Sequence, residues 1–394
     1  MEQQHEQLIA IRRDIHAHPE IAFEETRTAD LVAKQLQQWG IEVHRGLGKT
    51  GLVGVLHGAR GKGHRAIGLR ADMDALPMPE YNQFPHTSQN AGRMHGCGHD
   101  GHTTMLLGAV QYLAQHRDFE GTVNFIFQPA EEGGNAGARA MMADGLFERF
   151  PCDEIYGIHN LPEHPVGWFG VCPGPMMASS NRFDITIRGI GGHAATPEKT
   201  VDSIVIAAEM IGALQTLISR RTSPFDTAVL SITQVHAGDA YNVIPDHAVI
   251  RGTVRTFSLE VLDALERDIG HIVHTLPQVH GASGELKFIR AYPPVINHAA
   301  QANFAADVAA TLLDPQSVER NIQPVSIAED FAFYLEAVPG SYLFLGNGDG
   351  AHRTAGFAAG PCRLHTPSYD FNDALLPIGA SYWVRLVEAY FARA

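Results

Sequence analysis

The stretch VNFIFQPAEEGG, residues 123–134, joins a short apolar run to two adjacent carboxylates and a Gly-Gly turn. The run Val123–Phe127 is typical of a strand buried in a parallel sheet, because such strands are apolar on both faces. Two neighbouring carboxylates, Glu131 and Glu132, are costly together unless a cation neutralises one of them. The natural division is one metal ligand and one free base. An exposed acidic loop is the alternative, and the position directly after a buried strand favours a site.

Outward from this stretch, short apolar runs alternate with helical patterns. Alternation of this kind favours a mostly parallel sheet covered by helices, an α/β fold. The pattern resumes after Pro293, with a strand at 342–345 and a last helix near 376–390. The other expected strands are 51–56, 66–69 and 155–158, and the other expected helices are 28–39, 102–113 and 136–142.

The pattern changes near residue 180, where Phe183, Ile185 and Ile187 alternate with polar residues. The order from there is strand, helix, strand, strand, helix, strand, which is the ferredoxin-like order. We therefore expect a small α+β domain, residues 181–292, inserted into a larger domain formed by residues 1–180 and 293–394. Hinges are expected near 178–182 and 290–296.

Composition excludes several classes of protein. The 394 residues carry a net charge of −14, which argues against a nucleic-acid partner because such binding needs a basic surface. No apolar run reaches about 18 residues, so we expect no membrane partner. The N-terminus lacks the pattern of a secretory signal. Four widely separated cysteines do not resemble a disulfide framework, and they indicate a reducing cytoplasm.

The strongest local signal is MHGCGHDGH, residues 94–102. Cys97 and His99 are two residues apart, so an extended chain points both side chains the same way. A thiolate and an imidazole suit Zn, Mn, Co or Ni ions, with carboxylates such as Asp100 supporting them. A buried cysteine beside a helix-capping histidine is the alternative.

Two further histidines are candidates. His159 ends the apolar run 155–158, and His365 lies in the segment LHTP, residues 364–367. Either could instead be a histidine of the core. Ligands drawn from several strand ends are expected in an α/β site. Five candidates result, and five exceed the three or four protein ligands of one catalytic zinc. A two-metal site accommodates them better. The candidates are Cys97, His99, Glu132, His159 and His365.

Other residues of interest lie around these. Asp72 and Asp74 end the strand that begins at Ala66, and they are either supports for metal ligands or simple turn residues. In the small domain, a Gly-rich loop carries His193, which could donate a hydrogen bond to a developing oxyanion. Asn242 and Arg255 together would suit a carboxylate.

Together these segments resemble the di-metal aminoacylase/carboxypeptidase-like amidohydrolases, in the subgroup of hippurate hydrolase, N-acyl-amino-acid amidohydrolase and auxin-conjugate hydrolases. The resemblance extends from RDIHAHPE, residues 13–20, to YDFND, residues 369–373. Its most specific pieces are 95–102, 129–134, 191–197, 242–245 and 328–331. The sequence departs from the wider family at Asp72-Met73-Asp74, where many relatives have a ligating His-x-Asp. This departure leaves open how the ligands divide between two metals.

The resemblance implies a role for each candidate. The five candidate ligands match metal positions, and Glu131 matches the general base. His193 matches a small-domain histidine that reaches the scissile carbonyl, often in the site of the partner subunit. Asn242 and Arg255 match substrate-binding positions. The small domain matches a lid and dimerisation domain, so a homodimer is expected and a tetramer is possible.

The predicted activity is metal-dependent hydrolysis of the amide bond of N-acyl-L-amino acids, such as hippurate-like or N-acetyl compounds. A cation lowers the pKa of a water from about 15.7 towards 7, and Glu131 takes its proton. A dipeptidase or carboxypeptidase on the same scaffold is the alternative. A ligand-binding protein with a structural metal would have no need of Glu131, and a redox sensor at Cys97 would need a nearby resolving cysteine.

Overall fold

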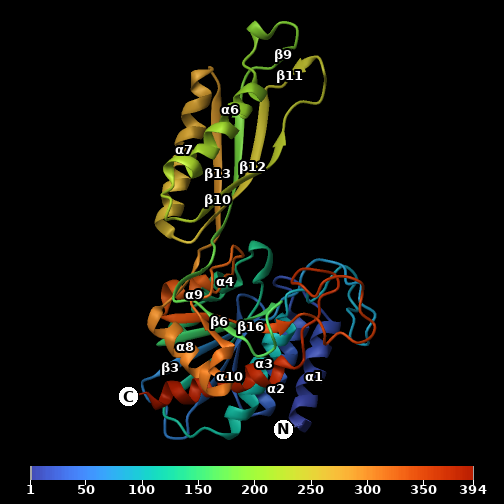
Figure 1. Ribbon diagram of the computed structural model, residues 1–394, viewed down its shortest axis with the longest axis vertical. Coiled ribbons are helices and arrows are strands. Elements are labelled where there is room, and N and C mark those ends of the chain that lie inside the picture. Colours follow the sequence, from blue (N-terminus) through green and yellow to red (C-terminus); the bar gives the residue numbers. More distant parts are fainter. Residues whose placement is uncertain (1, 394) are drawn as a thin grey trace. The chain divides into compact units, whose positions relative to one another are not determined.

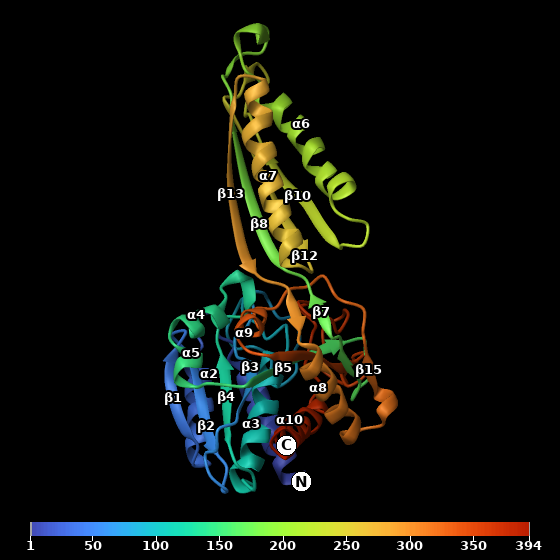
Figure 2. The ribbon, with the colours of Figure 1, turned by 90° about the vertical axis from the view of Figure 1, so that its left-hand side faces the viewer.

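A computed structural model describes residues 2–393 and divides them into two compact units. Unit 1 comprises residues 1–176, 296–323 and 330–394, and unit 2 comprises residues 177–295 and 324–329. The small unit is therefore inserted into the large one, with a second short excursion just before Asp330. Figures 1 and 2 show the elements of each unit.

The core of unit 1 is an eight-stranded sheet in the order β1-β2-β4-β3-β5-β16-β6-β15. Its central strands β4, β3, β5 and β16 are parallel neighbours, and the antiparallel pairs are β1–β2, β2–β4 and β16–β6. The mostly parallel sheet predicted from the sequence is confirmed. The strands are β1 (Glu42–Leu47), β2 (Gly51–His57), β3 (Ala66–Asp72), β4 (Thr122–Gln128), β5 (Glu154–Pro162), β6 (Phe169–Val171), β15 (Val318–Arg320) and β16 (Gly340–Gly348).

Helices pack along this sheet, and those near residues 28–39, 102–113, 136–142 and 376–390 were expected from the apolar pattern. One hydrophobic core joins the inner faces of α1, α2, α3, α8 and α10 to the sheet. The helices of unit 1 are α1 (Glu2–Ala17), α2 (Thr26–Gln38), α3 (His99–Gln115), α4 (Gly137–Ala143), α5 (Leu146–Arg149), α8 (Ala299–Leu312), α9 (Ala332–Ala337) and α10 (Leu375–Ala392), with short helical turns η1 (Glu132–Gly134) and η4 (Pro315–Ser317).

α3 differs from its prediction at the end that matters for function. The sequence predicts a start at His102, and the helix begins at His99. Gly98 precedes it with φ 95°, a left-handed conformation that glycine adopts freely. A side chain there would meet Asn160 Oδ1 at 2.2 Å. Nearly all residues of α3 are buried, so its sequence lacks the alternation of apolar and polar faces that would show where the first turn begins.

Unit 2 has a four-stranded antiparallel sheet in the order β10-β12-β8-β13. Helices α6 and α7 pack on one face of this sheet (Figures 1 and 2). The ferredoxin-like order is confirmed. The elements are β8 (Ser180–Arg188), β9 (Gly192–His193), η2 (Pro197–Lys199), α6 (Ser203–Thr216), η3 (Leu217–Arg221), β10 (Ala228–His236), β11 (Val243–Ile244), β12 (His247–Thr256), α7 (Leu259–Val279) and β13 (Ser283–Tyr292). The strands β7 (Gly174–Met177) and β14 (Val295–Asn297), most of whose residues belong to unit 1, pair with each other.

One helical segment of unit 2 tests the expectation that no membrane is involved. Residues 203–221, which are α6 and η3 together, are long and apolar enough to cross a membrane by length and composition. The buried core helix of a soluble protein passes the same test, so this is weak evidence of a span. Ile206, Met210 and Leu214 of α6 are fully buried in the core of unit 2, which accounts for part of this apolar character.

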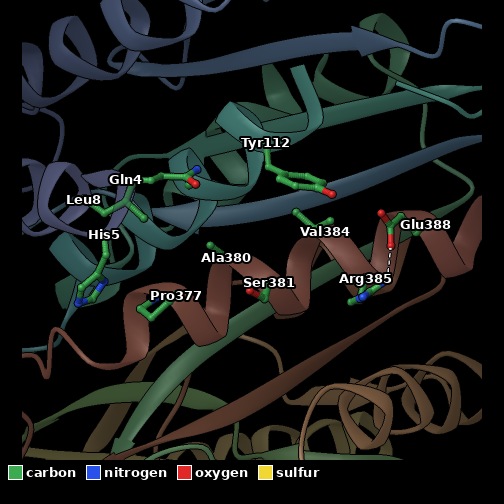
Figure 3. A pocket seen from close by; sticks show the side chains of 11 residues that line it. Gln4, His5, Leu8, Tyr112, Pro377, Ala380, Ser381, Val384, Arg385 and Glu388 are labelled. Carbon is green, nitrogen blue, oxygen red and sulfur yellow. Dashed lines mark hydrogen bonds and ion pairs between the residues drawn. The ribbon is translucent and has the colours of Figure 1, made fainter. Parts of the chain in front are cut away.

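A cavity of about 360 Å³ lies among α1, α3 and α10 of unit 1 (Figure 3). Apolar side chains such as Leu8 and Val384 line it, and Gln4, His5 and the Arg385–Glu388 ion pair lie around it. It is formed by helix surfaces and includes none of the expected site residues.

Candidate metal centre and active site

The carboxyl ends of β3, β4 and β5 bring the expected metal ligands of unit 1 together. Parallel neighbours end at the same edge of a sheet, so the residues after each strand converge. Cys97 and His99 stand at the start of α3, Glu132 follows β4, and His159 lies within β5. His365 comes from the long segment that precedes α10. The structure thus collects five candidates that are up to 268 positions apart in the chain.

The five candidates form two overlapping groups that share Cys97. One group is Cys97, His99 and His159, and the other is Cys97, Glu132 and His365. In each group the ligand atoms lie within 4.8 Å of one another. Cys97 Sγ is 3.3 Å from His159 Nε2, and His365 Nε2 is 3.1 Å from Glu132 Oε1. The two sets are not separate in space, because His99 of one set and Glu132 of the other also have ligand atoms within 4.8 Å of each other.

His365 is held in place by its backbone. It has φ 59°, in the left-handed region that a histidine rarely adopts. Its N–H donates to the carbonyl of Gly96 at 2.8 Å, one residue before Cys97. Strain that persists at such a position is commonly found at functional sites. The bond ties a ligand from the end of the chain to the ligand loop before α3.

Asp74 supports three parts of the cluster at once. Its carboxylate accepts the backbone N–H groups of Glu131 at 3.1 Å and of Glu132 at 2.9 Å. It also lies 3.3 Å from Nδ1 of His99. A proton on Nδ1 leaves the lone pair of Nε2 available, and His99 Nε2 is buried without a hydrogen-bond partner. Of the two readings of Asp74, the structure favours a support for ligands over a simple turn residue.

Asp72 supports the cluster from one layer further back. Its Oδ1 lies 2.6 Å from Nδ1 of His102, and its Oδ2 forms an ion pair with Nη1 of Arg70 at 2.7 Å. Nε2 of His102 lies 2.7 Å from Oδ1 and 3.0 Å from the backbone nitrogen of Asn160, so both ring nitrogens of His102 have hydrogen-bond partners. The sequence analysis gave no role to His102 or Asn160. Their closeness in sequence to candidate ligands could have indicated a role, because His102 is three positions after His99 and Asn160 directly follows His159.

The electrostatics of the cluster suit bound cations. Burial raises the pKa of the Cys97 thiol well above its usual value, and the nearby Glu132 and Glu131 raise it further. Burial would lower the pKa of His99, but the charges of Asp72 and Asp74 raise it to about 10. A divalent cation would neutralise the carboxylates and favour the thiolate. Thiol, imidazole and carboxylate donors together fit Zn or a similar ion.

Glu131 lies beside this cluster without being needed to complete either group. It is 6% exposed, and its carboxylate lies within 4.8 Å of ligand atoms of His99 and Glu132. Its backbone is fixed by Asp74 and follows Ala130, which has φ 53°. A buried carboxylate beside a metal group can accept a proton from water there.

The expected residues of unit 2 fall into two places. His193 in β9 is exposed and pairs with Val243 of β11, and the N–H of Ala194 donates to the carbonyl of Asn242 at 3.0 Å. The N–H of Ala195 donates to Nδ1 of His193 at 3.0 Å, so the ring proton lies on Nε2. The structure thus brings the segments of His193 and Asn242 together. The bond from Ala195 engages Nδ1 of His193 and leaves Nε2–H as a donor.

Arg255 lies near the other end of β12 from Asn242. It is eight positions along the strand from His247 at the start of β12, which is about 25 Å. The structure therefore does not form the joint Asn242–Arg255 carboxylate receptor within one chain. Arg255 is half-buried and donates to the carbonyl of Ser179 at 3.4 Å. It forms no ion pair with any side chain that the structure describes, so its charge is available to a ligand.

The fold and this cluster define a metal-dependent hydrolase, with a group of candidate metal ligands and the buried carboxylate of Glu131 beside it at the carboxyl edge of an α/β sheet. The chain belongs to peptidase family M20/M25/M40, which matches residues 68–389.

Relatives match almost the whole chain. It is 42% identical to the hippurate hydrolase of Campylobacter jejuni, over 96% of this chain and 95% of the relative. It is 38% identical to IAA-amino acid hydrolase ILR1-like 4 of Arabidopsis thaliana, over 97% of this chain and 85% of the relative. A crystal structure of Bacillus subtilis YXEP, described as a dinuclear metal binding peptidase from the M20 family, is 34% identical with a TM-score of 0.83, covering 99% of each chain.

Proposed function

We propose that this protein hydrolyses the amide bond of N-acyl-L-amino acids, releasing a carboxylic acid and a free amino acid. The observation that carries the proposal is Glu131, a buried carboxylate within 4.8 Å of ligand atoms of His99 and Glu132 that belongs to neither of the two ligand groups sharing Cys97. The names of the relatives, hippurate hydrolase and IAA-amino acid hydrolase, support the same class of substrate.

In this proposal Cys97, His99, Glu132, His159 and His365 hold two divalent ions, Mn, Zn, Co or Ni. Bound there, the ions would supply an acidified water and polarise the substrate carbonyl. Glu131 accepts the proton of the attacking water and then delivers it to the departing amine.

The residues of unit 2 bind the substrate. Arg255 offers a guanidinium without an acidic partner, which suits the α-carboxylate of the amino-acid half. His193 offers Nε2–H as a donor to the oxyanion that develops on the scissile carbonyl. Because Asn242 accompanies His193 and not Arg255, we propose that Asn242 assists at the same place as His193. Unit 2 then serves as a lid and as the dimerisation domain of a homodimer, and the enzyme works in the cytoplasm.

The test is release of amine from a panel of substrates, with added Mn²⁺ and after chelation. The panel holds benzoyl-glycine, several N-acetyl amino acids, indole-acetyl amino acids and plain dipeptides. Chelator-sensitive release from the acylated compounds supports the proposal and ranks the acyl groups. Silence of the whole panel with two metals bound per chain would overturn the substrate class.

Glu131→Gln tests the general base directly. The variant should bind metal as the wild type does while turnover falls by a factor of about 100 or more, since positioned acid–base groups contribute about 10²–10⁴-fold. Glu148→Gln, a change of an exposed glutamate on α5, is the matched control and should leave turnover unchanged. Activity that survives in Glu131→Gln would refute the assignment of the base.

A dipeptidase or carboxypeptidase is the second candidate, because the YXEP structure is described as a peptidase. Release from the dipeptides alone would favour it. Of the predicted rivals, a redox sensor at Cys97 has the least support, since reactive thiols have lowered pKa values and that of Cys97 is raised.

A further inference from the structure

Glu25 is a buried carboxylate that lies behind the turn carrying Glu131. It precedes α2 and has no exposed surface. Its Oε1 accepts the N–H of Ala130 at 2.9 Å and the N–H of Phe23 at 3.1 Å. Its Oε2 accepts the hydroxyl of Thr50 at 2.6 Å. One side chain thus joins three segments that are far apart in the sequence.

Each of these three segments contains a residue other than glycine in the left-handed region. Phe23 has φ 62°, Lys49 has φ 69° and Ala130 has φ 53°. Such a conformation places Cβ close to the following carbonyl and costs free energy for any residue with a side chain. A carboxylate that accepts N–H groups forms hydrogen bonds stronger than neutral ones. The contacts of Glu25 therefore offset strain at two of these positions directly, Phe23 and Ala130.

The strained Ala130 determines where Glu131 points. The N–H of Ala130 is held by Glu25, and its carbonyl accepts the N–H of Gly137 at 3.0 Å. The next two N–H groups, of Glu131 and Glu132, are held by Asp74. A relaxed φ at Ala130 would rotate the chain just before Glu131. The Glu25 carboxylate thus holds the N–H of Ala130 and helps to keep this residue in the left-handed conformation.

Burial makes the ionised form of the Glu25 carboxyl costly in free energy. Burial raises its pKa to about 7, and the charge of Asp74 contributes to the rise. A buried carboxylate that is costly to ionise is expected where its hydrogen bonds have a purpose. This electrostatic point supports the geometric one.

We propose that Glu25 is a positioning residue for Glu131, and that it acts by holding Ala130 in the left-handed conformation. The inference rests on the proposed function, in which Glu131 is the general base. The hydrogen bonds that the structure describes for the Glu25 side chain go to Phe23, Thr50 and Ala130 and to none of the five candidate ligands, so its effect should fall on turnover and not on substrate binding.

Glu25→Met removes the acceptors while keeping the volume of the side chain. We expect kcat to fall about 10- to 100-fold, the scale of a lost hydrogen bond to a charged group, with KM changed less than about threefold. Two metals should remain bound per chain. Glu25→Gln keeps one carbonyl oxygen for the Ala130 and Phe23 N–H groups, so it should restore most of kcat. Thr50→Val removes only the third donor and is the matched control, with kcat within about twofold of wild type.

A second substitution separates positioning from general damage. Glycine accepts φ 53° freely, so Ala130→Gly in the Glu25→Met background should recover kcat by about tenfold. A Glu25→Met variant that is less stable but retains wild-type kcat would show a structural role only. Failure of Ala130→Gly to recover any activity would refute the action through Ala130. If Glu25→Met does not fold, Glu25→Asp withdraws both oxygens by one methylene and should show the same loss and recovery.

Amide hydrogen exchange gives a readout that is independent of activity. In Glu25→Met, exchange of the peptide covering residues 128–133 should be about tenfold faster than in wild type, with the core strands unchanged. If the wild type proved inactive on every substrate, the proposed function would fail while this exchange still tested the contact. Unchanged exchange in a folded Glu25→Met variant would overturn the inference.

Discussion

Asp74→Asn should weaken metal binding although Asp74 is not one of the five candidate ligands. Asp74 accepts from Glu131 and Glu132 and lies close to Nδ1 of His99, all at 2.9–3.3 Å, so one carboxylate contacts both segments that carry candidate ligands. An asparagine keeps one acceptor oxygen and turns an N–H₂ group towards a donor, whichever way the amide lies. It also removes the charge that raises the pKa of His99.

The magnitude follows from the bonds that are lost. A buried hydrogen bond to a charged group contributes about 1.5–3 kcal/mol, and every 1.4 kcal/mol is about tenfold in an equilibrium constant. Loss of one such bond should therefore lower metal affinity about 10- to 100-fold. Partners that orient metal ligands in other proteins have effects of about the same size.

The assay is competition for Mn²⁺ and Zn²⁺ against a fluorescent chelator, with circular dichroism to verify the fold. Asp153→Asn is the matched control, since Asp153 accepts the N–H of Ala66 at 2.7 Å at the opposite end of β3. Its metal affinity should equal that of wild type. An Asp74→Asn protein that binds metal within threefold of wild type would refute the reasoning, and so would an equal loss in Asp153→Asn.

Three further outcomes are expected. Burial would raise the pKa of Asp370, but Arg12 at 2.8 Å lowers it to about 2, so Asp370 contributes about 2 kcal/mol of stability above pH 4 that is lost as the pH falls from about 4 to 2; urea unfolding across this range in wild type and Asp370→Asn checks it. Gly101→Ala would place Cβ 2.2 Å from a ring carbon of Phe371 and should destabilise by about 1–3 kcal/mol or more, whereas Gly212→Ala meets open space on α6 and should be neutral or stabilising in the same unfolding assay. Mn²⁺ at a hundred times its dissociation constant should stabilise the folded protein by about 2.7 kcal/mol, seen as a rise in Tm that chelation reverses; an unchanged Tm would contradict the metal site.

Local patterns were enough to predict most of the strands and helices. Strand β4 appears in the sequence as an apolar run, and α6 and α7 as long helical patterns. The elements that the sequence analysis did not predict are short or weakly patterned. β15 has three residues and pairs with β6, and α8 buries mainly alanines, whose small side chains give a weak apolar signal.

The candidate site was predictable in its chemistry and less so in its geometry. Cys97, His99 and Glu132 stand out because unusual residue types are crowded beside glycines. The sequence spacing of Asn242 and Arg255 did not reveal that most of β12 lies between them, so a joint role of the two residues stays a prediction. Glu25 gave no signal, because a glutamate before a helix is common and only the fold brings Ala130 to it.

Residue types and their local order thus establish which chemistry this chain carries: a thiol, imidazoles and paired carboxylates at strand ends in an α/β frame. The division of ligands into two groups sharing Cys97, the support of both ligand segments by Asp74 and the contact of Glu25 with Ala130 depend on long-range contacts. These contacts arise because parallel strands end at one edge and bring distant segments within hydrogen-bond distance. Strain at Ala130 and His365 persists only because those neighbours hold it, so no local pattern could have predicted it.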